Sequence, residues 1–240
     1  LAHYLSEKAT KITSGKTKSE RLLARQSMLA LGTMSGMRPE DPQLKDIAVG
    51  SIEEGIEANP HPMNRRPVYG ALANIGDPAL LRLVQEIPGP PDADMRKSAA
   101  VVVRRMPPAE TADFVGRWLD REQNWRVKNS LYRTVERQTF DAGEHPGRRV
   151  LAHAIDDLKK KPGPMTRKAL IRILGRGLEQ MEEDALGIEQ ALLEMIPYEL
   201  EKRSGLYGLI AEQIQNGDKL DRVVGEAVAQ INGRTSGEDE

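Results

Sequence analysis

The sequence lacks cysteine, has few aromatic residues and contains no long hydrophobic run, and each absence excludes a class of protein. Without cysteine among its 240 residues, the chain has no disulfide framework, no thiolate metal site and no cysteine nucleophile. Aromatic side chains make up only 4% of the chain, which is thin for the core of a β-sandwich or barrel. No stretch approaches the roughly 18 apolar residues of a transmembrane helix, so no membrane span is predicted.

A strong excess of one charge is also missing. The 35 lysines and arginines nearly balance the 36 aspartates and glutamates, which leaves a net charge of -1 and a pI of about 6.5. This balance argues against a strongly basic nucleic-acid binder. The sequence opens at Leu1 without a signal-like stretch, and we expect it to be a piece of a longer polypeptide.

Motifs for catalysis or metal binding are weak. Gly15-Lys16-Thr17 matches the end of a phosphate-binding loop, but the earlier glycine that such a loop requires is replaced by Thr10. None of the four histidines has a second histidine or a carboxylate at a metal-site spacing. We therefore predict no enzyme activity, no metal and no cofactor.

What the sequence does contain is an arginine that recurs at the start of six short apolar helices. These arginines are Arg25, Arg66, Arg96, Arg126, Arg167 and Arg203. They are 41, 30, 30, 41 and 36 residues apart, and helical self-similarity at such a period is typical of stacked helix pairs. The sequence predicts an all-α fold, a right-handed α-solenoid of about six helix pairs. We expect a single domain over residues 1–232 and a disordered acidic tail over 233–240.

Each predicted pair has an outer A helix, a short loop and an inner B helix that contains the recurrent arginine. Gly36 and Pro39 are expected to end the first B helix, and Gly76 the second. Asp77 is a candidate N-cap for the next helix, with Pro78 in its first turn. A single helix is predicted over 95–106, before Pro107-Pro108.

Two segments resemble HEAT repeats: "DADMRKSAAVVVRRMPP" (92–108) and "NIGDPALLRLV" (74–84). The likeness covers about residues 22–215 and implies that the B helices line a concave face. It also implies that each recurrent arginine pairs with an aspartate of a neighbouring repeat, in a partly buried ladder. The later repeats depart from the pattern, because no aspartate precedes Arg167 or Arg203.

Residues 22–137 also resemble the helical domain of vitellogenin-like large lipid transfer proteins, through "LALGTMSG", "ALANIGDPALLRLV" and "MRKSAAVVVRRMPP" in the same order. That resemblance implies a curved helical layer around a lipid cavity formed by β-sheets, and this sequence contains no such sheets. It leaves a lipid-handling shell domain as the alternative function, with lipid or a lipid-bound β-sheet domain as partner.

Charge is distributed unevenly between the A and B helices. The six B segments (25–36, 65–76, 95–106, 124–137, 166–177 and 202–215) hold 17 of the 35 basic residues, and their only acidic residues are Glu136 and Glu212. A concave surface of one sign attracts a partner of the opposite sign. A solvated basic helix face without any ligand explains the same pattern, and both interpretations stay open.

Eleven basic residues remain in the B segments when the six recurrent arginines are set aside, and eight of them form the candidate binding site. Its members are Lys97, Arg104, Arg105, Arg133, Arg137, Lys168, Arg172 and Arg176. Several recur at a spacing of four, which places them on one helix face, and guanidinium groups match carboxylate or phosphate ligands. The predicted function is a non-catalytic scaffold that binds an acidic protein surface or peptide, with nucleic acid a weaker candidate. Trp125, beside Arg126, is either a further binding anchor or a packing residue.

Overall fold

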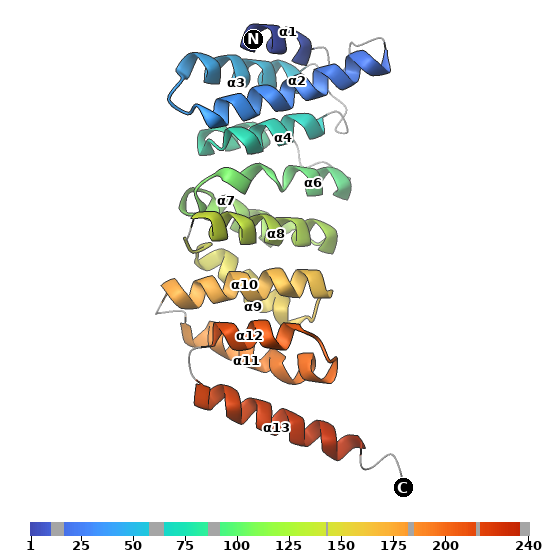
Figure 1. The fold of residues 1–240 in the computed structure, drawn as a ribbon, viewed down its shortest axis with the longest axis vertical. Coiled ribbons are helices and arrows are strands. Elements are labelled where there is room, and N and C mark those ends of the chain that lie inside the picture. The colour runs from blue at the N-terminus through green and yellow to red at the C-terminus, as the bar shows by residue number, and fades with distance from the viewer. Residues whose placement is uncertain are drawn as a thin grey trace. The chain divides into compact units, whose positions relative to one another are not determined.

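The computed structural model describes residues 1–10, 17–57, 65–85, 92–142, 144–181, 185–214 and 217–235. Within these ranges it contains thirteen α-helices, two short 3-10 helices and no strand (Figure 1). The predicted all-α class is confirmed. No helix in the same ranges combines the length with the apolar character that a membrane span needs.

The chain folds into two compact units. Unit 1 comprises Leu1–Thr111 and Glu122–Thr134, and unit 2 comprises Ala112–Arg121 and Val135–Glu240. The helices of unit 1 are α1 (Ala2–Ala9), α2 (Lys18–Met37), α3 (Pro42–Glu57), α4 (Arg66–Ile75), α5 (Leu81–Gln85) and α6 (Ala93–Ala99). The helices α7 (Pro108–Arg121) and α8 (Trp125–Ala142) contribute to both units. The helices of unit 2 are α9 (Arg148–Lys159), α10 (Pro164–Gln180), α11 (Ala185–Glu201), α12 (Leu206–Gln213) and α13 (Gly217–Thr235).

Several helix ends follow the local sequence signals. Gly76 ends α4 in the left-handed conformation, with φ of 73°, which a residue without Cβ adopts at little cost. Asp77 then caps the next element, since its carboxylate accepts a hydrogen bond of 2.9 Å from the backbone N–H of Ala79. Pro78 follows in the first turn, as predicted, but that turn is a 3-10 helix that precedes α5.

The first B helix ends at Met37, between Gly36 and Pro39 as predicted, and Gly36 itself lies inside the helix. The helix α2 continues to Met37, because Gly36 and Gly32 are packing residues rather than breakers. A Cβ built on Gly32 would lie 2.5 Å from the carbonyl oxygen of Ala71, and one on Gly36 would overlap the backbone of α4 at Asn74. The two glycines therefore allow α2 and α4 to approach more closely than larger residues permit.

Two further boundaries differ from the prediction. The helix expected over 95–106 is divided into α6 and a 3-10 helix, Val102–Arg105, since three consecutive β-branched valines weaken the α-helix there. The last helix, α13, extends to Thr235, which is three residues into the predicted disordered tail. The rest of that tail, residues 236–240, lies outside the described residues.

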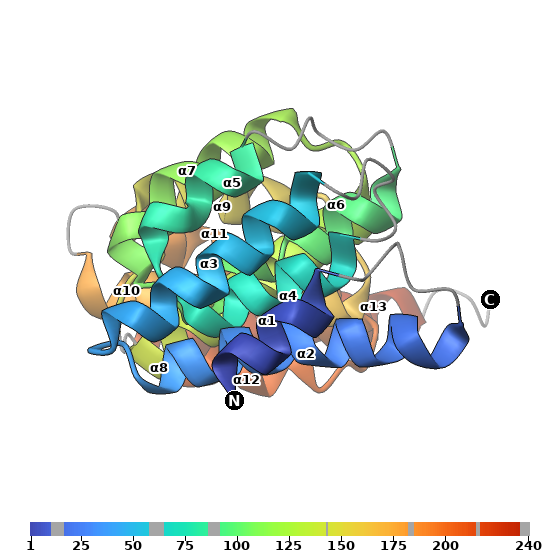
Figure 2. The same cartoon turned by 90° about the horizontal axis from the view of Figure 1, so that it is seen from above.

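The B helices of unit 1 stack side by side in a fixed register. Thr33 of α2 accepts a hydrogen bond of 3.0 Å from the Asn74 side chain of α4, and four residues earlier Leu29 packs against Gly70. Both pairs are 41 residues apart, so α2 and α4 run parallel. Across the unit from α2, the A helices α3 and α5 lie on the other side (Figure 2).

The register continues through the later B helices at slightly different offsets. Asn74 also accepts a hydrogen bond from Arg104, 30 residues on, and the Lys97 carbonyl accepts one from Ser130, 33 residues on. Within unit 2, an ion pair joins α8 and α10 across 36 residues, and α10 packs against α9, α11 and α12. Helices about 30–41 residues apart in sequence are thus neighbours inside each unit.

Candidate functional site

Two of the six recurrent arginines form ion pairs inside the fold. In unit 1, Arg96 of α6 binds Glu122 through Nε at 2.7 Å and Nη2 at 3.1 Å. Glu122 is buried and also accepts a hydrogen bond from the backbone of Asn124, just before α8. The hydrogen bond to Glu122 raises the pKa of Arg96 above its ordinary value. This pair connects a B helix to the end of the following A helix.

Unit 2 contains a similar arginine–glutamate ion pair that is more deeply buried. Arg167 of α10 binds Glu199 of α11 through Nε at 2.5 Å and Nη2 at 3.2 Å, with side chains 7% and 0% exposed. The guanidinium also donates to the carbonyl of Pro162 at 2.6 Å. Its Cζ lies 5.1 Å from the centre of the Tyr198 ring, within the range of a cation–π interaction. Both partners are therefore glutamates, not the aspartates that the HEAT resemblance implied.

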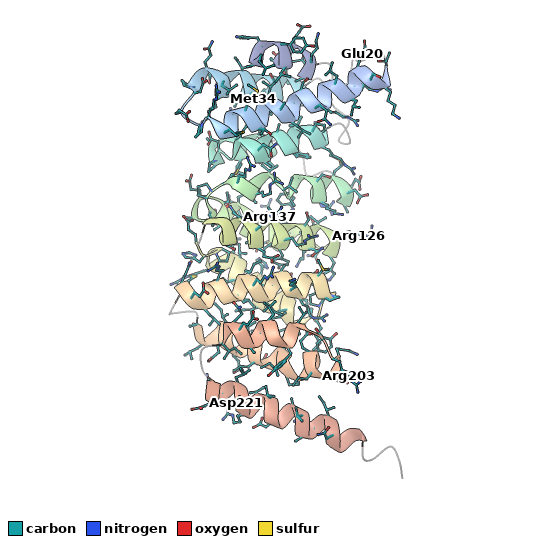
Figure 3. All side chains as sticks on the ribbon, viewed as in Figure 1. Glu20, Met34, Arg126, Arg137, Arg203 and Asp221 are labelled. Atoms are coloured by element: carbon teal, nitrogen blue, oxygen red, sulfur yellow. The ribbon has the colours of Figure 1, made fainter. Side chains whose placement is uncertain are left out.

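The expectation of buried arginines is wrong for the other four members. Arg25, Arg66, Arg126 and Arg203 are all exposed. Arg203 lies in the turn before α12 with φ of 48°, not on a helix (Figure 3). The 33-residue offset between α6 and α8 places Asn129 rather than Arg126 beside Arg96, so Arg126 has no equivalent partner.

Some of the predicted binding residues of unit 1 form hydrogen bonds within the fold, and others are exposed to solvent. Arg104 is half-buried and donates a 3.0 Å hydrogen bond to the Asn74 side chain, while Arg105 donates to the Asn74 carbonyl at 3.5 Å. Lys97 and Arg133 are exposed, and neither side chain has a hydrogen bond or ion pair within the part of the chain that the structure describes. Arg104 thus helps to hold the stack together.

The predicted residues of unit 2 lie on α8 and α10 and are here called the unit 2 patch. Its members are Arg137, Lys168, Arg172 and Arg176. Arg172 pairs with Glu136 at 2.6 Å and is 48% exposed, and Arg176 pairs with Glu179 at 2.7 Å. Arg137 (Figure 3) and Lys168 are exposed and form no ion pair with any described residue. The patch therefore has four cations against two carboxylates.

A second charged cluster in unit 2 joins α7 to α9. Arg149 pairs with Asp113 and Asp120, and His153 lies 2.7 Å from Asp120. The hydrogen bond with His153, followed by that from Arg149, lowers the pKa of Asp120. No three His, Asp or Glu side chains among the described residues are placed to hold a metal ion.

Comparison of the sequence with known families gives no matching family model. Neither the curated proteins nor the solved structures contain a match. The resemblances to HEAT repeats and to lipid transfer proteins stay predictions.

Proposed function

We propose that this chain is a non-catalytic binding module, a right-handed α-solenoid of about six HEAT-like helix pairs that recognises an acidic protein surface. The solenoid is supported by the stacking register, in which successive B helices contact one another at offsets of 41, 30, 33 and 36 residues. A single helix pair cannot bury its own apolar face. The neighbouring pairs cover that face, as in other repeat arrays. The right hand is carried over from the HEAT resemblance.

The unit 2 patch is the observation that carries the binding proposal. On α10, Lys168, Arg172 and Arg176 follow one another at one-turn intervals, while Leu170 and Leu174 on the opposite face are fully buried. Buried packing holds the helix in place, so its charged face is presented at fixed spacing. Guanidinium groups bind carboxylates through two parallel hydrogen bonds, and this geometry favours an acidic surface as the ligand.

An acidic protein is favoured over nucleic acid because of the overall charge. A chain with a net charge of -1 exerts little long-range attraction on a polyanion, so binding depends on short-range pairs at the patch. Glu136 and Glu179 lie within the patch and repel a ligand with charge at every position. A protein surface with a few separated carboxylates avoids that repulsion.

The test is a pull-down from native lysate at low and high salt, with protein, nucleic acid and lipid each identified in the bound fraction. We expect an acidic protein at low salt that is lost at high salt and lost with Arg172→Glu/Arg176→Glu. The matched control is Lys159→Glu/Arg222→Glu, which makes the same charge change at exposed residues of α9 and α13. Undiminished recovery with the patch variant would refute the proposal, and salt-insensitive recovery of lipid would favour the lipid-handling alternative.

A further inference from the structure

Unit 1 carries a second set of cations, one on each of the helices α2, α4, α6 and α8, here called the N-terminal row. Its members are Arg25 of α2, Arg66 of α4, Lys97 of α6 and Arg126 of α8. All four side chains are exposed, and none forms a hydrogen bond or ion pair with another residue in the described ranges of the chain. Three of them had been predicted to lie inside an arginine ladder, so their exposure leaves them without a structural role.

The contacts between α2 and α4 place the first two members next to each other. Arg25 lies two turns before Thr33, and Arg66 lies two turns before Asn74. The hydrogen bond between Thr33 and Asn74 fixes the register of these parallel helices. Leu29 packs against Gly70, and Arg25 and Arg66 each lie one turn before these two residues, so Arg25 and Arg66 are neighbours across the helix pair.

The same reasoning extends the row to α6 and α8. The bond between Arg104 and Asn74 has an offset of 30 residues, which places Arg96 level with Arg66 and Lys97 one residue farther along the chain. The carbonyl of Lys97 accepts a hydrogen bond from Ser130, and Arg126 lies one turn before Ser130. Arg126 and the N-terminal end of α2 at Glu20 lie on the same side of the unit (Figure 3).

The spacing of the row indicates the shape of its ligand. Packed helices have axes about 8–10 Å apart, whereas an extended polypeptide rises about 3.3 Å per residue. About three residues of an extended chain therefore cover the distance from one B helix to the next. We infer that the N-terminal row of unit 1 binds an extended acidic peptide whose carboxylates recur at about every third residue. This inference is independent of the unit 2 patch.

Most of the carboxylates at this end of unit 1 are already used by the fold. The Glu20 side chain accepts a hydrogen bond from the Thr17 backbone, and Asp92 accepts one from Asp94. Glu122 is bound to Arg96, and Asp94 remains as an exposed carboxylate near the row. Glu20, Asp92 and Asp94 are exposed and keep their negative charge, so the four cations of the row exceed these three carboxylates by one.

An exposed tryptophan lies at the end of the row. Trp125, 39% exposed, begins α8 next to Arg126, and Lys128 Nζ lies 5.5 Å from its ring centre. Tryptophan and arginine are frequent anchors in protein interfaces. Binding of single-stranded nucleic acid relies on aromatic rings that stack successive bases, and Trp125 is the only aromatic adjacent to a described member of the row. This arrangement favours a peptide over nucleic acid.

The experiment measures the fluorescence anisotropy of labelled peptides of about ten residues added to the purified chain, a length that spans four helices at the spacing above. One peptide has aspartate at every third position between glycine and serine, and the other has the same composition with its aspartates contiguous. We expect the spaced peptide to bind more tightly. We expect Arg25→Gln/Arg66→Gln to weaken it about fivefold to tenfold, from two exposed ion pairs.

The control variant is Arg38→Gln/Arg82→Gln, which removes two exposed cations of unit 1 outside the row and should leave the affinity unchanged. Circular dichroism checks that each variant keeps its helix content. Equal affinity for the two peptides, or full affinity in the row variant, would overturn the inference. Tighter binding of oligodeoxythymidine would overturn the choice of a peptide. The variant Arg172→Glu/Arg176→Glu should bind the spaced peptide normally, so the failure of one proposal is distinguishable from the failure of the other.

Discussion

The ion pair between Arg167 and Glu199 allows a quantitative test of the packing in unit 2. Glu199→Gln keeps the size of the side chain and removes its charge. Arg167 then remains in a site where it is only 7% exposed, with the Pro162 carbonyl as its remaining strong acceptor. Removing one partner of a buried ion pair costs about 3–5 kcal/mol, because the other charge is left uncompensated.

The expected magnitude is measurable by urea unfolding followed by circular dichroism. With an m value of about 2 kcal/mol/M, a loss of about 4 kcal/mol lowers the midpoint of the unit 2 transition by about 2 M. The matched control is Glu136→Gln, which breaks the pair with Arg172, where the arginine is 48% exposed. Exposed pairs contribute about 0–1 kcal/mol, so its midpoint should move by about 0.5 M or less.

A double substitution separates the value of the pair from the cost of breaking it. In Arg167→Met/Glu199→Leu no charge is left buried, and apolar side chains of similar length occupy the site. We expect most of the stability lost in Glu199→Gln to return, since apolar replacement of a buried pair is often neutral or stabilising. If Glu199→Gln shifts the midpoint no more than Glu136→Gln does, the reasoning from burial is refuted.

Two further predictions concern helix packing and pH. Gly32→Ala should destabilise unit 1, because the added Cβ would lie 2.5 Å from the Ala71 backbone. Gly50→Ala in α3, where no atom lies within 4 Å of the added Cβ, should instead stabilise the unit by about 0.5–1 kcal/mol. Thermal unfolding of both variants measures these effects, and equal effects would contradict the close approach of α2 and α4. The lowered pKa of Asp120 means that its contribution to stability is present above the ordinary aspartate pKa of about 3.9 and is lost as pH falls through the lower folded value. The difference in urea midpoint between wild type and Asp120→Asn should therefore shrink progressively as the pH falls below about 5, and a difference that persists at the lowest pH would count against the hydrogen bonds as its cause.

Much of the local structure was predictable from the sequence, because helix ends depend on nearby residues. Gly76, Asp77 and Pro78 mark the end of one helix and the start of the next through backbone conformation and short-range hydrogen bonds. Apolar spacing likewise identified α3 and α10 within a few residues of their observed bounds. The packing role of Gly36 is not predictable from nearby residues, because it depends on α4, which begins thirty residues later.

The roles of the arginines were decided only by tertiary structure. All six share one sequence pattern, yet Arg96 and Arg167 are paired, whereas Arg25 and Arg66 are exposed. The difference lies in whether a glutamate, 26 or 32 residues farther along, is brought to the guanidinium by the next A helix. A charged side chain is buried only where its desolvation is offset by such a partner. The sequence by itself determined that the chain is helical and where most helices begin, whereas packing between helices decided which cations support the fold and which remain available to a ligand.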